Sequence, residues 1–230
     1  MDQNSPRHRT PRLTRDLVDK LPASIDDPGA LPELAALQTE AFFDSTLKDV
    51  LANRPDSPLW VFAFSSLIWK PGFEEADRRV ADAQGWHRAL CLGPDTRYRG
   101  NPDAPGYALS LDIGGSCRGV ALQLPDADLD ATLDTLLRRE PPFPPVWVEA
   151  STDDGPLTCL AFVTHRDLPG YVGDLDLDEI AADLSRAVGL FGSAPDYLLN
   201  TVQNLEDASI HDPYLWDLQD RVARYLEAME

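Results

Sequence analysis

The order of strand-like and helical segments is the feature of this sequence that most limits its fold. Residues 60–164 carry short apolar runs separated by turn residues, with one helical pattern among them, whereas residues 177–229 read as successive helices. A doubly wound parallel sheet would require strands and helices to alternate regularly along the chain. The sequence therefore predicts an α+β fold whose short strands form a small barrel.

The expected strands fall into two hairpins after an initial strand. The initial strand is residues 80–92. The first hairpin pairs residues 107–111 with 117–124 around a turn at Gly114 and Gly115. The second pairs residues 146–150 with 157–164 around Asp153, Asp154 and Gly155. Glycine accepts the positive φ that tight turns need. Helices are expected over residues 125–140, 177–190, 195–207 beginning from Ser193, and 213–229 entered through Asp212.

The first 57 residues are polar and punctuated by proline. One short helix is expected at residues 45–52, capped by Ser45. We therefore interpret residues 1–57 as an appendage, partly disordered or helical, and residues 58–230 as a single domain.

Charge and cysteine usage restrict the partners and the compartment. The formal net charge is −19, from 39 acidic and 20 basic residues, which disfavours nucleic acid and anionic membranes as partners. Three widely spaced cysteines indicate buried thiols in place of a disulfide framework or a metal site. Without an apolar leader or a membrane-length stretch, the protein is expected in the cytoplasm. The oligomeric state is not indicated.

An anionic substrate would have to be held by local basic groups. Such groups cluster in one stretch, comprising Lys70, Arg78, Arg79, Arg88, Arg97, Arg99 and Arg118. Solvated arginines on strand faces are the alternative for most of them.

The segment WVFAFSSLIWKPGF, residues 60–73, is the clearest functional feature. An apolar strand there runs directly into two serines, whose small side chains leave main-chain N–H groups approachable. The candidate residues for holding a carboxylate or an oxyanion are Phe62, Ala63, Phe64, Ser65, Ser66 and Leu67. An ordinary polar turn is the alternative.

Glu140 is the candidate proton-transfer group. Leu129, Leu133 and Leu136 recur at helical spacing, and continuing that count brings Glu140 onto the same stripe. A carboxylate withdrawn from water has a raised pKa, which suits acid–base chemistry near neutrality. Alternatively the helix ends at Arg139 and Glu140 enters solvent, because two prolines follow.

Other polar residues give weaker signals. His87, His165 and His211 are isolated and receive no role. Tyr197 lies on a predicted helix, where core packing and ligand binding are both open. No dinucleotide-binding loop, P-loop, zinc-protease helix or nucleophile elbow is present in the sequence.

Several segments together resemble the ChaC-type, glutathione-specific γ-glutamylcyclotransferase family, from Trp60 to about Leu226. The segment at residues 60–73 is similar to the family's FGYGSLIW signature, and Arg139-Glu140 is similar to its catalytic RE pair. Arg97-Tyr98-Arg99-Gly100, Pro105-Gly106, GGSCRGVA from Gly114 and YLLNTVQNLEDASIHDPYL from Tyr197 resemble further family elements.

The resemblance implies a small mixed β-barrel flanked by helices and a lyase that converts glutathione to 5-oxoproline and cysteinylglycine without a metal or other cofactor. It also implies that Glu140 is the general base and acid. Substrate would be bound by the turn at residues 62–67 together with Arg99 and Tyr197.

The chain departs from the family pattern at two places. The usual Tyr-Gly-Ser-Leu is replaced by Phe64-Ser65-Ser66-Leu67, preceded by Ala63 where glycine is usual. The segment after Glu140, Pro-Pro-Phe-Pro-Pro, is shorter and lacks a tyrosine. Two alternatives therefore stay open: a non-catalytic module that binds γ-glutamyl ligands, and a cyclotransferase for another γ-glutamyl amine or dipeptide.

Overall fold

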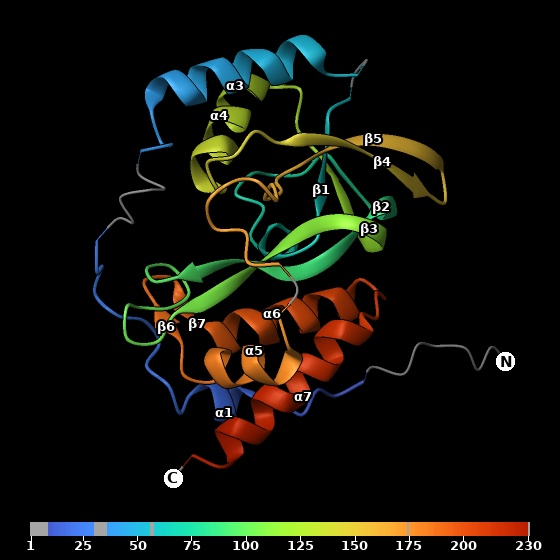
Figure 1. Cartoon of the computed structure of the whole chain (residues 1–230). Helices are drawn as coiled ribbons and strands as arrows, with labels where there is room; N and C mark the ends of the chain where they lie inside the picture. The colour runs from blue at the N-terminus through green and yellow to red at the C-terminus, as the bar shows by residue number, and fades with distance from the viewer. Residues whose placement is uncertain (1–8, 30–35, 56–57, 174, 230) are drawn as a thin grey trace, which may run out of the picture. The chain divides into compact units, whose positions relative to one another are not determined.

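The computed structural model describes residues 9–29, 36–55, 58–173 and 175–229, which form two compact units (Figure 1). The described residues of the first unit are 9–28, 95–107 and 175–229, and those of the second are 29, 36–55, 58–94 and 108–173. The N-terminal segment thus contributes to both units. A single domain from residue 58 onward stays a prediction.

The second unit is built on a closed barrel. Its strands are β1 (Trp60–Ala63), β2 (Asp77–Asp95), β3 (Gly106–Gln123), β4 (Val146–Thr152) and β5 (Gly155–Ala161), in the order β1-β3-β2-β4-β5. Strand β1 is antiparallel to β3 and parallel to β5, so the barrel is mixed. The predicted α+β class with a small mixed barrel is confirmed.

Strand β1 lies inside the unit, and all four of its residues are buried. This burial explains its uninterrupted apolar sequence. A Cβ atom on Gly119 of β3 would lie 2.6 Å from the carbonyl oxygen of Ala63 and 2.8 Å from Cζ of Phe62. Glycine at that position therefore allows the end of β1 to approach β3 closely.

The predicted hairpin around Gly114 and Gly115 is wrong. Both glycines have positive φ, 109° and 70°, but they lie within the continuous strand β3. Positive φ at paired glycines bends a strand as readily as it turns a chain, and the sequence alone does not separate the two outcomes.

The second hairpin is confirmed. Strands β4 and β5 pair in antiparallel register from Val146 opposite Ala161 to Thr152 opposite Gly155. Gly155 has a φ of 118°, as the turn prediction required. The loop is therefore only Asp153 and Asp154.

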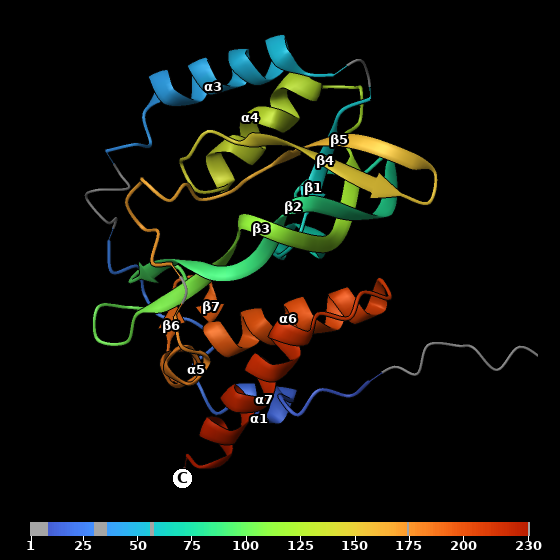
Figure 2. The ribbon, with the colours of Figure 1, turned by 45° about the vertical axis from the view of Figure 1, so that its right-hand side comes forward.

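The described residues of the second unit also form two α-helices and one short 3-10 helix. They are α3 (Glu40–Asn53), η1 (Ser66–Ile68) and α4 (Leu129–Arg139). The predicted helix start at Ser45 is wrong, because Thr39 caps α3 through a hydrogen bond from the Phe42 amide. Helices α3 and α4 lie side by side in both views (Figures 1 and 2).

The first unit is mainly helical. It contains α1 (Arg15–Val18), α5 (Leu177–Leu184), α6 (Ala194–Asp207), α7 (Pro213–Glu227) and the two-stranded ribbon β6 (Val188–Gly189) and β7 (Gly192–Ser193). The predicted caps Ser193 and Asp212 are confirmed, with side chains that accept from the amides of Asp196 and Leu215. Helix α5 ends six residues earlier than predicted, because the chain after Ala187 enters the β6–β7 ribbon.

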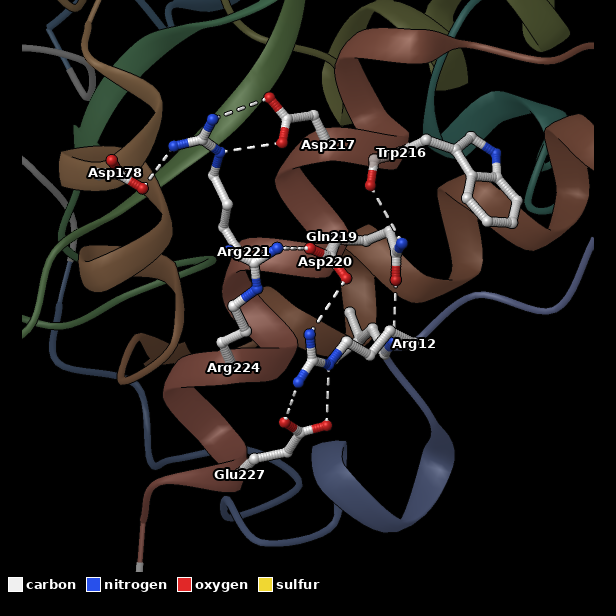
Figure 3. Close-up of polar contacts among 10 residues, drawn as sticks. Arg12, Asp178, Trp216, Asp217, Gln219, Asp220, Arg221, Arg224 and Glu227 are labelled. Atoms are coloured by element: carbon white, nitrogen blue, oxygen red, sulfur yellow. Dashed lines mark hydrogen bonds and ion pairs between the residues drawn. The ribbon is translucent and has the colours of Figure 1, made fainter.

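Polar contacts tie the N-terminal residues to α7 within the first unit (Figure 3). Arg12 donates to both carboxylate oxygens of Glu227, at 3.0 and 2.6 Å. The buried amide of Leu13 donates to Oε1 of Gln219 at 2.8 Å. Exposed ion pairs add little stability, so the buried contact and the fully buried Leu13 side chain carry more of this attachment.

Within the described ranges, no helix combines the length and apolarity needed to cross a bilayer.

Candidate active site

The turn after β1 is the first part of the candidate site. Phe62 and Ala63 are fully buried in β1, Phe64 follows it, and Ser65 precedes η1. The half-buried Ser65 and Ser66 are followed by the buried Leu67. The buried strand thus delivers two accessible small residues to the surface of the barrel.

Three consecutive main-chain amides in this turn have no acceptor in the described part of the chain, those of Ser65, Ser66 and Leu67. The next amides along the chain are paired, since Ile68 N–H donates to the Ser65 carbonyl and Lys70 N–H to that of Ser66, each at 2.9 Å. Unpaired adjacent amides form a concavity that suits an anion or a polarised carbonyl oxygen.

Ser65 stands where the resembled family pattern has glycine. Ser65 has a φ of −146°, outside the left-handed region that favours glycine. A positive φ is therefore not a reason for glycine at this position.

Glu140 is the second part of the candidate site. Helix α4 ends at Arg139, and Glu140 is its C-cap, with its amide donating to the Leu136 carbonyl at 3.0 Å. The predicted helix over residues 125–140 is longer than α4 by four residues at its start and by one residue, Glu140, at its end. The alternative of a solvated side chain is also wrong, because only 15% of that side chain is exposed.

The environment of the Glu140 carboxylate favours its neutral form. Among the described residues it accepts no hydrogen bond, and the charged group beside it is Nε of Arg139 at 3.5 Å. Burial raises the pKa of Glu140, and the positive charge of Arg139 offsets only part of that rise. A carboxyl group in this state can take and return a proton near neutral pH.

Arg139 connects Glu140 to the turn. Its Nη1 donates to the carbonyl of Lys70, whose own amide donates to the Ser66 carbonyl. Gly72 makes room for this contact, since a Cβ there would lie 3.0 Å from the same nitrogen. Two short steps of hydrogen bonding therefore link the acid-bearing helix end to the amide-bearing turn.

Arg99 and Tyr197, the other predicted site residues, belong to the first unit. The Arg99 guanidinium lies 4.4 Å from the centre of the Tyr197 ring and donates to the Phe191 carbonyl at 3.0 Å. The Asp95 carboxylate accepts from the amides of Arg97, Tyr98 and Arg99, which fixes the loop that carries Arg99. The structure thus brings these two predicted residues together.

Arg88 has no specific role in the sequence-based prediction, which names it only as one of a cluster of basic residues. It is 6% exposed, and its guanidinium donates to the Phe64 and Arg118 carbonyls, at 2.7 and 2.8 Å. The available signal was its position directly before the apolar run Ala89, Leu90 and Cys91 in a predicted strand. A charge in such a run is rarely buried without a specific partner.

A hollow in the second unit is a separate feature. Its volume is about 590 Å³, and it is lined by residues 72–76, 125, 127, 128, 131, 132 and 135. Glu74, Glu75 and Asp128 make it acidic, and neither Glu140 nor the turn at residues 62–67 contributes to it. Across the residues described, no three His, Cys, Asp or Glu side chains gather in a way that would hold a metal ion.

Comparisons with known proteins agree with the predicted resemblance. A family model described as ChaC-like protein matches residues 59–225. The chain is 34% identical over 187 residues to the glutathione-specific gamma-glutamylcyclotransferase of Escherichia coli (strain K12), covering 79% of this chain and 80% of that protein. It is 32% identical over 178 residues to glutathione-specific gamma-glutamylcyclotransferase 1 of Mus musculus, covering 73% and 79%.

A solved structure supports the fold. The crystal structure of a gamma-glutamyl cyclotransferase specific to glutathione from yeast matches with a TM-score of 0.68 and 22% identity, over 74% of this chain and 97% of that chain. At that identity the likeness concerns the fold alone.

Proposed function

The chain belongs to the ChaC-like family, and from that premise we propose that it cleaves glutathione to 5-oxoproline and cysteinylglycine. The observation that carries the proposal is the pairing of a mostly buried, unbonded carboxyl group with a turn of three unpaired amides in one compact unit. Cyclisation of a γ-glutamyl group needs both a proton carrier and donors for a developing oxyanion.

In the proposed reaction, the α-amine of the γ-glutamyl group attacks its own γ-carbonyl carbon. The new nitrogen–carbon bond closes a five-membered lactam, while the bond from that carbon to the cysteine nitrogen breaks. Because the reacting atoms belong to one molecule, holding the substrate in a bent conformation removes much of the entropic barrier.

Glu140 moves the proton in this proposal. Its carboxylate takes the proton that the attacking amine loses, and the resulting carboxylic acid gives it to the departing nitrogen. A raised pKa suits both halves of this cycle, since the group must be a base first and an acid afterwards.

The turn at residues 62–67 stabilises the developing negative charge on the γ-carbonyl oxygen. The amides of Ser65, Ser66 and Leu67 are neutral, fixed by the backbone and not engaged elsewhere in the described residues. Preorganised donors of this kind cost no reorganisation when the charge appears.

Arg99 is proposed to bind a carboxylate of the substrate, because glutathione carries two and the chain is acidic overall. The ring of Tyr197 beneath the guanidinium limits its orientations, which favours a defined contact. A cytoplasmic location completes the proposal, since the three cysteines are buried thiols of the kind that a reducing compartment preserves.

The experiment is to incubate the purified protein with glutathione, γ-glutamylcysteine and γ-glutamylalanine and to measure 5-oxoproline by chromatography. We expect product from glutathione, loss of product in Glu140→Gln, and normal rates in Glu149→Gln, an exposed acid of β4. Product from another compound but not from glutathione would identify a different γ-glutamyl compound as the substrate. Binding without any product would favour a non-catalytic module.

A further inference from the structure

Arg88 of β2 is a buried cation whose hydrogen bonds lead to the candidate site. The barrel order places β3 between β2 and β1, and the Arg88 side chain reaches along this path. Its Nη2 donates to the Arg118 carbonyl of β3 at 2.8 Å, and its Nε donates to the Phe64 carbonyl beyond the end of β1 at 2.7 Å. One guanidinium therefore fastens the start of the turn to the neighbouring strand.

The Phe64 carbonyl belongs to the same peptide unit as the N–H of Ser65. In a planar trans peptide, the C=O and N–H bonds point in opposite directions. A donor that fixes the carbonyl of Phe64 therefore also fixes the Ser65 N–H, on the side away from Arg88. The positive charge of the donor further polarises the peptide unit and strengthens that N–H as a donor.

Gly119 makes this arrangement possible. Because a side chain at Gly119 would collide with the Ala63 carbonyl, the end of β1 approaches β3 closely only beside a glycine. The carbonyl of the preceding residue, Arg118, accepts from the Arg88 guanidinium. Two different nitrogens of one guanidinium bind the Phe64 and Arg118 carbonyls, which suits the planar fork of arginine better than the single ammonium of lysine.

We propose that Arg88 is a positioning residue that holds the Phe64–Ser65 peptide unit with its N–H directed at the γ-carbonyl oxygen of the substrate. The proposal rests on the proposed function for its catalytic consequence. Its structural content, the coupling of the Arg88 guanidinium to the Ser65 amide, can be measured without turnover.

The first measurement uses the wild-type protein labelled with ¹⁵N and titrated with 5-oxoproline, the expected product. The Ser65 amide and the Arg88 Nε–H should shift together, with the same midpoint, because both belong to one hydrogen-bonded unit. A Ser65 signal that moves while the Arg88 Nε–H stays still, or a Ser65 signal that does not respond, would overturn the proposal. This measurement uses only the wild-type protein, so its result does not depend on whether a variant folds.

The second measurement compares Arg88→Lys with Arg118→Lys. Arg118 is the matched control, since it lies on the neighbouring strand and its side chain is 53% exposed and paired with Asp82. We expect Arg88→Lys to shift the Ser65 amide signal and to lower kcat by about tenfold or more, as expected when one oxyanion donor is misaligned. KM should change by less than about threefold.

Arg118→Lys should retain the wild-type kcat and the wild-type Ser65 signal. A merely structural role of Arg88 would lower the melting temperature and the folded fraction but leave kcat per folded molecule unchanged, and that outcome would overturn the proposal. If the wild type releases no 5-oxoproline from glutathione, the proposed function fails, while the titration of Ser65 and Arg88 still decides the coupling.

Discussion

Asp112 and Glu140, two largely buried acids of the second unit, differ in the hydrogen bonds that their carboxylates accept. The Asp112 carboxylate of β3 accepts from Nε of Arg166 at 2.7 Å, from the hydroxyl of Tyr171 at 2.8 Å and from the Ile113 amide at 2.7 Å. The Glu140 carboxylate accepts no hydrogen bond within the described residues. Their side chains are 4% and 15% exposed.

This difference moves their pKa values in opposite directions. Burial would raise the pKa of Asp112, but hydrogen bonds from Arg166 and Tyr171 outweigh it, so the pKa lies below its ordinary value. Burial raises the pKa of Glu140, and Arg139 offsets only part of that rise. A fully bonded buried acid stays ionised and supports the structure, whereas a buried acid left unbonded can exchange protons with a ligand.

The largest expected effect is on turnover. Glu140→Gln preserves shape but removes the proton carrier, and we expect the rate of 5-oxoproline formation to fall by about a thousandfold or more. The rate is measured by chromatography, with Glu149→Gln as the control. A rate within tenfold of wild type would assign the proton transfer to another group.

The next effect is on stability. Asp112→Asn removes a buried charge that Arg166 and Tyr171 bind, and we expect the free energy of unfolding in urea to fall by about 3 kcal/mol at pH 7. Asp82→Asn breaks only the exposed pair with Arg118 and should cost less than about 1 kcal/mol.

The pH dependence sharpens this second prediction. The pKa of Asp112 is lower in the folded protein than its ordinary value of 3.8. The contribution of Asp112 to the free energy of unfolding is therefore complete above pH 3.8 and is lost as the pH falls toward the folded pKa. The difference between wild type and Asp112→Asn should therefore shrink on acidification. Equal losses of stability at pH 7 and under acidic conditions would contradict the assignment.

A smaller effect of opposite sign is expected for the stability of Glu140→Gln. The folded pKa of Glu140 is raised, so the wild type is fully stable below the ordinary value of 4.5 and loses stability as the pH rises through the folded value. Thermal unfolding should show a higher melting temperature for the variant at pH 8 and no difference below pH 4.5. A variant that is less stable at pH 8 would mean that Glu140 has a structural partner.

The smallest effect is expected for Arg139→Gln. Removing the positive charge beside Glu140 should raise the pKa of that acid further, so the acidic limb of the pH–rate profile moves to higher pH. Arg138→Gln is the matched control, because Arg138 pairs with Glu40 and Asp134 and not with Glu140. An acidic limb that moves equally in both variants would show that the shift is not specific to Arg139.

Some elements were predictable because their signals are local. Ser193 and Asp212 each precede a proline in the first turn of a helix, and the structure uses both as caps. The hairpin of β4 and β5 could be predicted for the same reason, because Gly155 supplies the positive φ that the turn between the two strands needs.

Other elements depended on strand pairing that the local sequence does not specify. Gly114 and Gly115 bend β3 within the barrel where a turn was expected, and residues 188–189 form a strand where α5 was expected to continue. Strand β3 pairs with β1 and β2 in the barrel, and β6 pairs with the nearby β7, Val188 opposite Ser193. Strand pairing overrode the local preference in both cases.

By itself, the sequence determined the α+β class, the caps of α6 and α7 and the candidacy of Glu140 and the turn at residues 62–67, because these follow from periodicity, capping and motif order. Only the tertiary structure decided that Glu140 is buried and unbonded, that Asp112 is buried and fully bonded, and that Arg88 binds the Phe64 carbonyl. Burial and hydrogen-bond partners come from residues distant in the chain, and these contacts set the protonation of an acid and the direction of an amide.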